Sequence, residues 1–275
     1  MVSVPANDPD LDPDLDPGLV ARLRAAGCVF AEDEAAVLTE AAPDAAAREP
    51  LVRRRLAGEP LEHVVGWADF AGVRVAVEPG VFVPRQRTSY LVEVAADALA
   101  GVAGERPGVL LDLACGSGAL GLALARRRPG LTLHASDLDP TAAACAAANL
   151  APVGGTAHCG DLTAPLPQPL RGTVDVIVAN VPYVPTSAVP LMPADSREHE
   201  PRTTVDGGPD GLDLLRRVAV LAGDWLREGG AVFCEVSRDQ AEAARAAFTA
   251  AGLRAVVRHD PERDATVLAG RTPTA

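Results

Sequence analysis

The sequence predicts a mixed α/β fold, in which a mostly parallel sheet has helices on both faces and follows a small helical region. Two observations lead to this prediction. From residue 109 onward, short apolar runs alternate with longer stretches whose apolar residues recur at helical spacing. Alternation of this kind is typical of parallel strands joined by helices. A chain of 275 residues is long enough for one large domain and a small one.

The composition limits the classes of protein to which the chain can belong. With 25 basic and 37 acidic side chains, the net charge is −12, which disfavours stable binding to nucleic acid. No run of about 18 uncharged apolar residues is present, so we expect no membrane partner. The acidic N-terminus does not resemble a secretory signal. The five cysteines form no CxxC pair, which predicts neither a disulfide framework nor a metal site and favours the reducing cytoplasm.

Residues 1–16 are predicted to form a disordered acidic tail. Aspartate recurs at every second position from Asp8 to Asp16, and no basic residue is present to balance it. Repeated Asp-Pro units favour an extended, solvated chain.

Residues 17–66 are predicted to form a small helical domain. Asp16 can cap a first helix that begins at Pro17. A second helix is expected over 32–42, and a third begins near Pro50. Helices this short are not stable alone, so they should pack together as a bundle.

Residues 67–84 have the pattern of a β-hairpin that links this bundle to the rest of the chain. Val73, Val75 and Val77 alternate with polar or small residues, and Glu-Pro-Gly at 78–80 supplies a turn.

The third predicted domain, 85–275, contains the alternating strands and helices. A helix over 89–100 comes first. Strands are then expected at 109–114, 131–137, 156–159, 174–180, 230–236, 254–259 and 265–270. Helices between them are expected at 119–127, 140–150, 211–226 and 238–252. Because no helix separates the last two strands, they should form an antiparallel hairpin at the sheet edge. A ligand is expected at the carboxyl ends of the first strands.

A glycine-rich turn follows the first of these strands, in the segment Asp112-Leu-Ala-Cys-Gly-Ser-Gly118. Gly116 and Gly118 would let the backbone approach a ligand closely, where a Cβ would collide. The GxGxxG fingerprint of dinucleotide sites is incomplete, so a tight packing turn is the alternative.

Two acidic residues follow the next two strands. Asp137 lies about 20 residues beyond the glycine turn, where an acid can accept hydrogen bonds from ribose hydroxyls. A helix cap is the alternative role, but Asp139 is better placed for it. After the third strand, Asp161 could accept a hydrogen bond from an adenine amino group while Leu162 covers the ring. An ordinary loop acid is the alternative there.

The tetrapeptide Asn180-Val181-Pro182-Tyr183 directly follows an apolar strand. The Asn180 side-chain oxygen and the Val181 carbonyl can accept the two N–H bonds of a primary amide. An amide nitrogen is a poor nucleophile because its lone pair is delocalised, and these acceptors would orient it and favour its rehybridisation. Pro182 would stiffen the turn, and Tyr183 would form a flat wall. We therefore predict that these four residues are catalytic; the alternative is a turn with a buried tyrosine.

These motifs and their order resemble the HemK/PrmC family of S-adenosylmethionine-dependent methyltransferases, which modify the N5 nitrogen of a glutamine in peptide chain release factors. The resemblance extends from about residue 50 to the C-terminus, and its most specific stretch is REHEPRTTVDGGPDGLDLLRR. It implies a class I methyltransferase fold with a seven-stranded, Rossmann-like sheet. It also implies that the N-terminal helical domain helps to hold the protein substrate.

The resemblance implies S-adenosylmethionine as cofactor, S-adenosylhomocysteine as product, and no metal. The cofactor-binding residues it implies are Asp112, Ala114, Cys115, Gly116, Ser117, Gly118, Asp137, Asp161, Leu162 and Asn180. The substrate glutamine, in the GGQ loop of a class 1 release factor, would be held by the tetrapeptide. Glu198 and Arg202, in the long loop 184–209, are candidate substrate contacts.

Two departures from the family pattern bear on the substrate. The usual NPPY is NVPY here, but Val181 keeps the carbonyl that the proposed role needs. The PRPET-like segment is PRQRT at 84–88, so Arg87 replaces an acid near the expected cofactor mouth. Three alternatives therefore stay open: an N-methyltransferase that acts on another protein, one that acts on a small molecule or an adenine base, and a cofactor-binding module without enzymatic activity.

Overall fold

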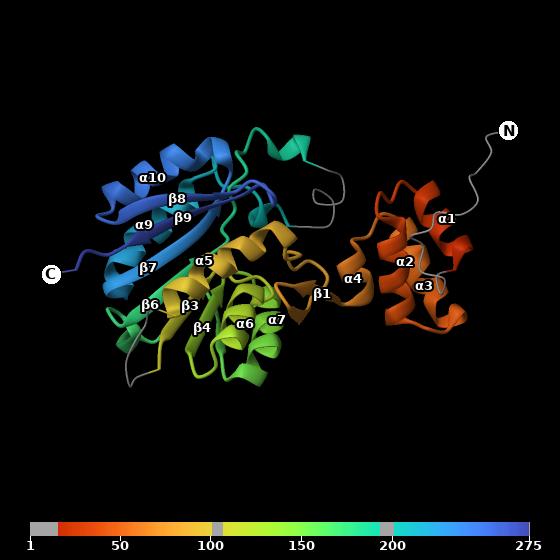
Figure 1. Ribbon diagram of the computed structural model, residues 1–275, viewed down its shortest axis with the longest axis horizontal. Helices are drawn as coiled ribbons and strands as arrows, with labels where there is room; N and C mark the ends of the chain where they lie inside the picture. The colour runs from red at the N-terminus through yellow and green to blue at the C-terminus, as the bar shows by residue number, and fades with distance from the viewer. Residues whose placement is uncertain (1–15, 101–106, 193–200, 275) are drawn as a thin grey trace. The chain divides into compact units, whose positions relative to one another are not determined.

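The structure is a computed structural model that describes residues 16–100, 107–192 and 201–274 (Figure 1). The chain divides into two compact units, one up to Gly66 and one from Trp67 onward. Almost all of the predicted acidic tail, residues 1–15, lies outside the described residues.

The described part of the first unit is helical. Its helices are α1 (Pro17–Ala25), α2 (Ala31–Ala41), α3 (Ala45–Leu56) and α4 (Leu61–Val65). The Asp16 carboxylate accepts a hydrogen bond from the Gly18 N–H and caps α1, as predicted. Leu23 and Leu38 are fully buried between the helices and form the centre of the unit's own core.

The prediction that a helix begins near Pro50 is wrong. Helix α3 begins at Ala45, because Asp44 caps it by accepting hydrogen bonds from the N–H groups of Ala46 and Ala47. Pro50 lies inside the helix, where it has no N–H to donate to the carbonyl four residues earlier. The cap and the burial of Val52 outweigh that one missing bond.

The second unit begins with the predicted hairpin, formed by β1 (Trp67–Phe70) and antiparallel β2 (Val73–Ala76). Its turn is not the expected Glu-Pro-Gly at 78–80. It lies at Ala71 and Gly72, which both have positive φ, at 48° and 86°. Two positive φ angles match the right-handed twist of a two-residue hairpin. Alanine seldom adopts a positive φ, so a turn at Ala71 is not expected from the residue type.

A seven-stranded sheet forms the centre of the second unit, with the strand order β5-β4-β3-β6-β7-β9-β8. The strands are β3 (Val109–Leu113), β4 (Thr132–Asp137), β5 (Thr156–Cys159), β6 (Val174–Ala179), β7 (Leu226–Val236), β8 (Arg254–Asp260) and β9 (Ala265–Arg271). Strands β3 to β7 pair in parallel, whereas β9 is antiparallel to both β7 and β8. The predicted antiparallel hairpin at the sheet edge is therefore confirmed.

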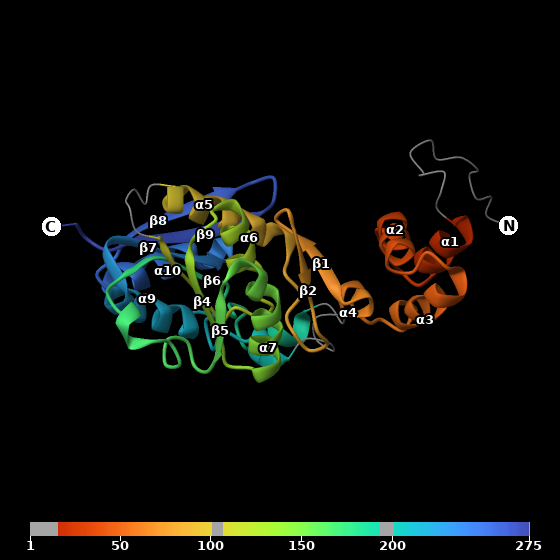
Figure 2. The same ribbon diagram turned by 90° about the horizontal axis from the view of Figure 1, so that it is seen from below.

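Helices cover both faces of this sheet (Figures 1 and 2). One face carries α5 (Ser89–Ala100), α6 (Ala119–Arg127) and α7 (Pro140–Leu150), and the other carries α9 (Asp213–Trp225) and α10 (Ala241–Ala250). Side chains alternate along each strand, so Leu110 packs in the first layer and Leu111 in the second. Burial on both faces explains why the two central strands, β3 and β6, are almost entirely apolar.

Short 3-10 helices connect several of these elements: η1 (Gln86–Thr88), η2 (Ala151–Val153), η3 (Gln168–Leu170), η4 (Val189–Leu191), η5 (Arg202–Thr204) and η6 (Arg238–Gln240). None of the described helices is both long enough and apolar enough to cross a bilayer.

The order of the strands reverses between β3 and β6, which are neighbours in the sheet. From β3 the chain moves outward through β4 to β5, and it then returns to β6 and continues outward on the other side through β7. Such a reversal leaves a crevice at the carboxyl ends of the two central strands. The glycine-rich turn follows β3 and Asn180 follows β6, so the fold brings both motifs to this crevice.

Candidate active site

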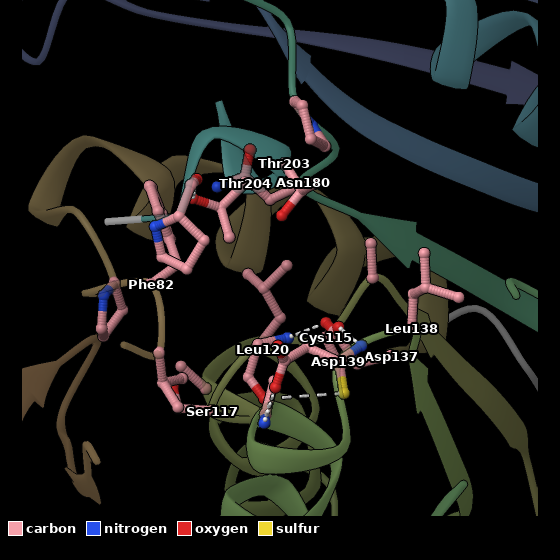
Figure 3. A pocket seen from close by; sticks show the side chains of 18 of the residues that line it. Phe82, Cys115, Ser117, Leu120, Asp137, Leu138, Asp139, Asn180, Thr203 and Thr204 are labelled. Carbon is pink, nitrogen blue, oxygen red and sulfur yellow. Dashed lines mark hydrogen bonds between the residues drawn. The ribbon is translucent and has the colours of Figure 1, made fainter. Parts of the chain in front are cut away.

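A cavity of about 370 Å³, called the first cavity below, lies at the carboxyl ends of the central strands (Figure 3). The predicted site residues that line it are Ala114, Cys115, Gly116, Ser117, Asp137, Asp161, Leu162, Asn180 and Pro182. In Figure 3, Asn180 and Thr204 lie across the cavity from Cys115 and Asp137. The fold thus brings together residues from the loops after β3, β4, β5 and β6.

The two glycines of the turn after β3 have different tasks. Gly116 has φ +54°, and a Cβ there would meet nothing closer than Phe82 at 4.0 Å, on the cavity side. Gly118 has φ +75°, and a Cβ there would lie 3.2 Å from the Cβ of Ala146 in α7. Gly116 therefore keeps the first cavity open, whereas Gly118 lets α6 pack closely on α7.

The carboxylate of Asp137 lies at the end of β4 and is bound by the turn itself. One oxygen accepts a hydrogen bond from the Gly116 N–H at 2.8 Å and the other from the Asp139 N–H at 2.9 Å. Asp139 caps α7 instead, as predicted. Burial raises the pKa of Asp137 above its ordinary value. Each Asp137 oxygen keeps a second lone pair with which it can accept a hydrogen bond from a ligand.

Asp112 lies behind the glycine turn and does not line the first cavity. Its carboxyl group is fully buried, and one oxygen accepts a hydrogen bond from the Gly121 N–H at 2.8 Å. The other oxygen has no hydrogen-bond partner among the residues that the structure describes. Burial raises the pKa of Asp112 to about 8, so the group is mostly protonated at neutral pH. Any effect of Asp112 on a ligand would be transmitted through the turn.

Asp161, Leu162 and Leu138 also line the first cavity. Asp161 forms an ion pair with Arg217, at 2.6 Å between Oδ2 and Nη2, and both side chains are about half exposed. Leu162 is buried, whereas Leu138 is 68% exposed. The two leucines therefore add apolar surface to the cavity, on which a flat ring can lie.

A second cavity of about 440 Å³, called the second cavity below, adjoins the first. Four residues line both cavities: Phe82, Asn180, Pro182 and Thr204. Val181 and Tyr183 line the second cavity. Asn180 therefore borders the two spaces at once, and a group bound in one cavity can meet a group bound in the other beside its side-chain amide.

The stretch DGGPDG, at 206–211, packs against the backbone of the tetrapeptide. A Cβ on Gly207 would lie 2.6 Å from the carbonyl oxygen of Pro182, and one on Gly211 would collide with the carbonyl of Tyr183. The Gln240 side chain donates hydrogen bonds to the carbonyls of Tyr183, at 2.7 Å, and Asp210, at 2.9 Å. Only glycine fits at positions 207 and 211, because any side chain there would collide with the backbone of the tetrapeptide.

The side chain of Tyr183, the last residue of the tetrapeptide, meets two charged side chains from other segments. The Arg87 Nε and the Tyr183 hydroxyl each donate a hydrogen bond to the same Glu235 oxygen, both at 3.1 Å. The Tyr183 hydroxyl also accepts a hydrogen bond from Arg87. Burial, followed by the negative charge of Glu235, raises the pKa of Tyr183 above its ordinary value, so the phenol stays neutral at physiological pH. Arg87, Tyr183 and Glu235 are called the triad below.

Comparison with known proteins identifies the family. The release factor glutamine methyltransferase of Moorella thermoacetica is 39% identical over 215 residues, which cover 78% of this chain and 75% of that protein. The protein with the same name from Mycolicibacterium smegmatis is 40% identical over 223 residues, with the same coverage. The chain belongs to the release factor glutamine methyltransferase family. The resemblance predicted from the motifs is therefore confirmed.

Two further findings agree with a methyltransferase. The methyltransferase small domain family matches residues 72–193. A solved methyltransferase structure from Pyrococcus furiosus is 16% identical, covers 74% of this chain and 90% of that one, and has a TM-score of 0.53. At that identity, the likeness concerns the fold alone. The predicted class I methyltransferase fold is confirmed.

Membership in a methyltransferase family implies S-adenosylmethionine, and the residues of the first cavity fit it. The volume lies within the usual range of cofactor sites, and the lining is largely apolar with a few polar groups directed inward. Gly116 leaves room for a ligand next to the backbone. Asp137 offers free lone pairs at the distance along the chain where a ribose acceptor is expected.

The predicted substrate contacts in loop 184–209 have separate outcomes. Glu198 lies outside the described residues. The Arg202 side chain forms an ion pair with Asp206, at 3.0 Å, and lines neither cavity. The loop's two ends lie side by side, because the Val184 N–H donates to the Val205 carbonyl and Val184 accepts from the Gly207 N–H.

Several residues of the site could not be predicted from its motifs. Phe82, Leu138 and Thr204 line the cavities, and Glu235 completes the triad. The available signal for Glu235 is an acid within the otherwise apolar strand predicted at 230–236. Among the described residues, no three His, Cys, Asp or Glu side chains are grouped so that they could hold a metal ion.

Proposed function

We propose that this protein transfers a methyl group from S-adenosylmethionine to the side-chain amide nitrogen of a glutamine, in the Gly-Gly-Gln loop of a class 1 peptide chain release factor. The observation that carries the proposal is the position of Asn180, which borders both cavities. The names of the relatives support the choice of substrate. A release factor substrate implies a location in the cytoplasm, which is part of the proposal.

The first cavity would hold the cofactor, which supplies an electrophilic methyl group when bound. The backbone from Ala114 to Gly118 would contact its methionine part, directly or through packing. Asp137 would accept hydrogen bonds from the ribose hydroxyls. Asp161 would accept one from the adenine amino group, and Leu162 would cover the ring. Together these groups would fix the direction in which the methyl group faces the second cavity.

The second cavity would hold the glutamine side chain. The Asn180 Oδ1 and the Val181 carbonyl would accept the two N–H bonds of its amide, which points the nitrogen lone pair at the donor. Because these acceptors also favour a pyramidal nitrogen, they bind the transition state more strongly than the planar ground state. The extra proton is lost readily from the methylated amide to water, so no general base is needed.

A direct experiment tests this function. The full chain is incubated with S-adenosylmethionine that carries a labelled methyl group and with a recombinant class 1 release factor. Peptide mass spectrometry then locates the label. We expect it on the glutamine of the Gly-Gly-Gln loop, and we expect none when that glutamine is replaced by alanine. A protein that binds S-adenosylhomocysteine but leaves the glutamine unlabelled would contradict the proposal.

A further inference from the structure

The second cavity has arginine side chains in its lining, and a buried acid lies behind its wall. Arg85 and Arg87 line it, and no Asp or Glu is among its described lining residues. Glu235 does not line the cavity; it is 3% exposed and lies behind the wall. Both charged side chains among its described lining residues are therefore guanidinium groups.

Arg87 compensates the charge of Glu235. One Glu235 oxygen receives hydrogen bonds from Arg87 and Tyr183, and the other has no hydrogen-bond partner among the described residues. A buried carboxylate without a cationic partner is strongly destabilising and would attract any cation that enters the neighbouring space. When Arg87 is present, its positive charge neutralises the Glu235 carboxylate behind the cavity wall. Without Arg87, a ligand in the second cavity would be next to an uncompensated negative charge.

The same contacts orient Tyr183. Its hydroxyl accepts from Arg87 and donates to Glu235, which fixes the plane of the ring in the cavity wall. The carbonyl of Tyr183 is held from the other side by Gln240. Arg87 thus affects both the charge of the second cavity and the position of its flat wall.

We propose that Arg87 is a positioning residue that, together with Glu235, makes the second cavity select a neutral amide over a charged amine. The inference rests on the proposed function, because it concerns the acceptor in the same site. An ammonium group would face the Arg87 guanidinium, which lines the second cavity while the Glu235 carboxylate is buried behind it, and would incur a like-charge penalty. A neutral amide pays none and meets Asn180.

The test compares two peptides that differ in one residue. Both carry the release factor loop sequence, one with the acceptor glutamine and one with lysine in its place. Binding of each peptide is measured by calorimetry with S-adenosylhomocysteine present, and kcat and KM are measured for the glutamine peptide. The proteins are the wild type and the variants Arg87→Gln, Arg87→Lys, and Arg87→Gln combined with Glu235→Gln.

The proposal predicts a distinct result for each protein. The wild type binds the glutamine peptide at least about tenfold more tightly than the lysine peptide. Arg87→Gln lowers this ratio about tenfold or more, because Glu235 is left uncompensated. Arg87→Lys keeps the ratio but lowers kcat, since lysine keeps the charge and loses the planar fork that holds Tyr183. The double variant has the same net charge as the wild type and regains most of the ratio.

Other outcomes separate the proposal from the function on which it rests. Equal ratios in the wild type and Arg87→Gln would overturn the proposal, and so would a wild type that binds neither peptide or binds both equally. If the wild type binds the peptides selectively but methylates no glutamine in peptide or release factor, the proposed function fails instead. Should Arg87→Gln not fold, Arg87→Lys and the double variant still give the comparison: a double variant without selectivity would contradict the proposal.

Discussion

Asn149 and Ala76 exchange a pair of hydrogen bonds, each 2.9 Å long, that join helix α7 to strand β2. The Asn149 side-chain oxygen accepts from the Ala76 N–H, and its nitrogen donates to the Ala76 carbonyl. The same nitrogen donates to the carbonyl of Ser117 at 2.9 Å. One side chain therefore connects the hairpin, α7 and the glycine-rich turn that lines the first cavity.

We expect Asn149→Ala to destabilise the protein by about 2 kcal/mol, because the Ala76 N–H and the Ser117 carbonyl lose their side-chain partner and the Ala76 carbonyl keeps only the weak Cys145 thiol donor. Affinity for S-adenosylhomocysteine should fall severalfold as well, since the turn at Ser117 loses an anchor. Urea denaturation and calorimetry measure the two effects. Asn149→Asp keeps an acceptor for the Ala76 N–H but cannot donate, so it should also destabilise. A loss of stability below about 0.5 kcal/mol in both variants would show that these bonds are not structural supports.

Asp137→Asn should lower the affinity for S-adenosylhomocysteine by about tenfold to a hundredfold, because hydrogen bonds to a charged acceptor are replaced by neutral ones. In the wild type, burial raises the pKa of Asp137 above its ordinary 3.8. The carboxylate form binds the ribose, so affinity should be constant at neutral pH and fall as the pH drops through the raised pKa. Calorimetry over a pH series measures this. The variant should lack that acid limb; an identical pH dependence in both proteins would exclude Asp137 as its source.

Two glycines with similar backbone angles provide a matched test of the support beneath the tetrapeptide. Gly211 has φ +78° and Gly154 has φ +73°, so alanine at either position incurs a left-handed strain of about 1 kcal/mol. A Cβ at Gly154 would meet nothing within 4 Å, whereas one at Gly211 would collide with the Tyr183 carbonyl. We therefore expect Gly211→Ala to lower kcat at least about tenfold while Gly154→Ala leaves it unchanged. Equal kcat values in steady-state assays would contradict this role.

The sequence was sufficient for most of the fold of the second unit because several local signals agreed there. The helix over 140–150 has an aspartate cap at Asp139, a proline at its first position and an apolar face, and it forms as predicted. Two predictions about the fold failed, the start of the third helix and the turn of the hairpin, and in both places the local residue types were misleading. At Pro50 the residue suggests a helix start, but the cap at Asp44 is stronger. At the hairpin turn, Ala71 adopts a positive φ that alanine seldom has.

Some residues of the site could likewise be predicted from the sequence, and others could not. Asn180 and the glycine turn could be predicted because each directly follows a buried strand, and the ends of neighbouring parallel strands meet. The triad could not, because it depends on the register of β6 against β7. That register places Ala179 opposite Cys234, so that Glu235 lies beside the start of the tetrapeptide. The contacts of Arg87 with Tyr183 and Glu235 could not be predicted either, because they join residues far apart in the sequence.

The buried carboxyl group of Asp112 should make stability depend on pH. Its pKa is about 8 in the folded protein and near 3.8 when unfolded, so the folded state holds the proton more tightly. Between these values, this group removes about 1.4 kcal/mol of stability for each unit by which the pH rises. Asp112→Asn cannot ionise and should lose less stability than the wild type from pH 5 to 8. Urea denaturation at several pH values measures the slopes; equal slopes would show that Asp112 does not titrate in this range.

Asn180 and Val181 should separate a side-chain role from a backbone role at adjacent positions. Asn180→Ala removes the amide acceptor and should lower kcat by at least about a hundredfold, while affinity for S-adenosylhomocysteine changes less than about threefold. Val181→Ala keeps the carbonyl and should hold kcat within about threefold, although loss of a buried side chain lowers stability by about 1–2 kcal/mol. Steady-state kinetics on a release factor give kcat for both variants. Titration calorimetry gives the cofactor affinity of Asn180→Ala, and urea denaturation gives the stability of Val181→Ala. A large loss of cofactor affinity in Asn180→Ala would assign the residue to the donor side, and a large loss of kcat in Val181→Ala would show that the valine side chain shapes the acceptor pocket.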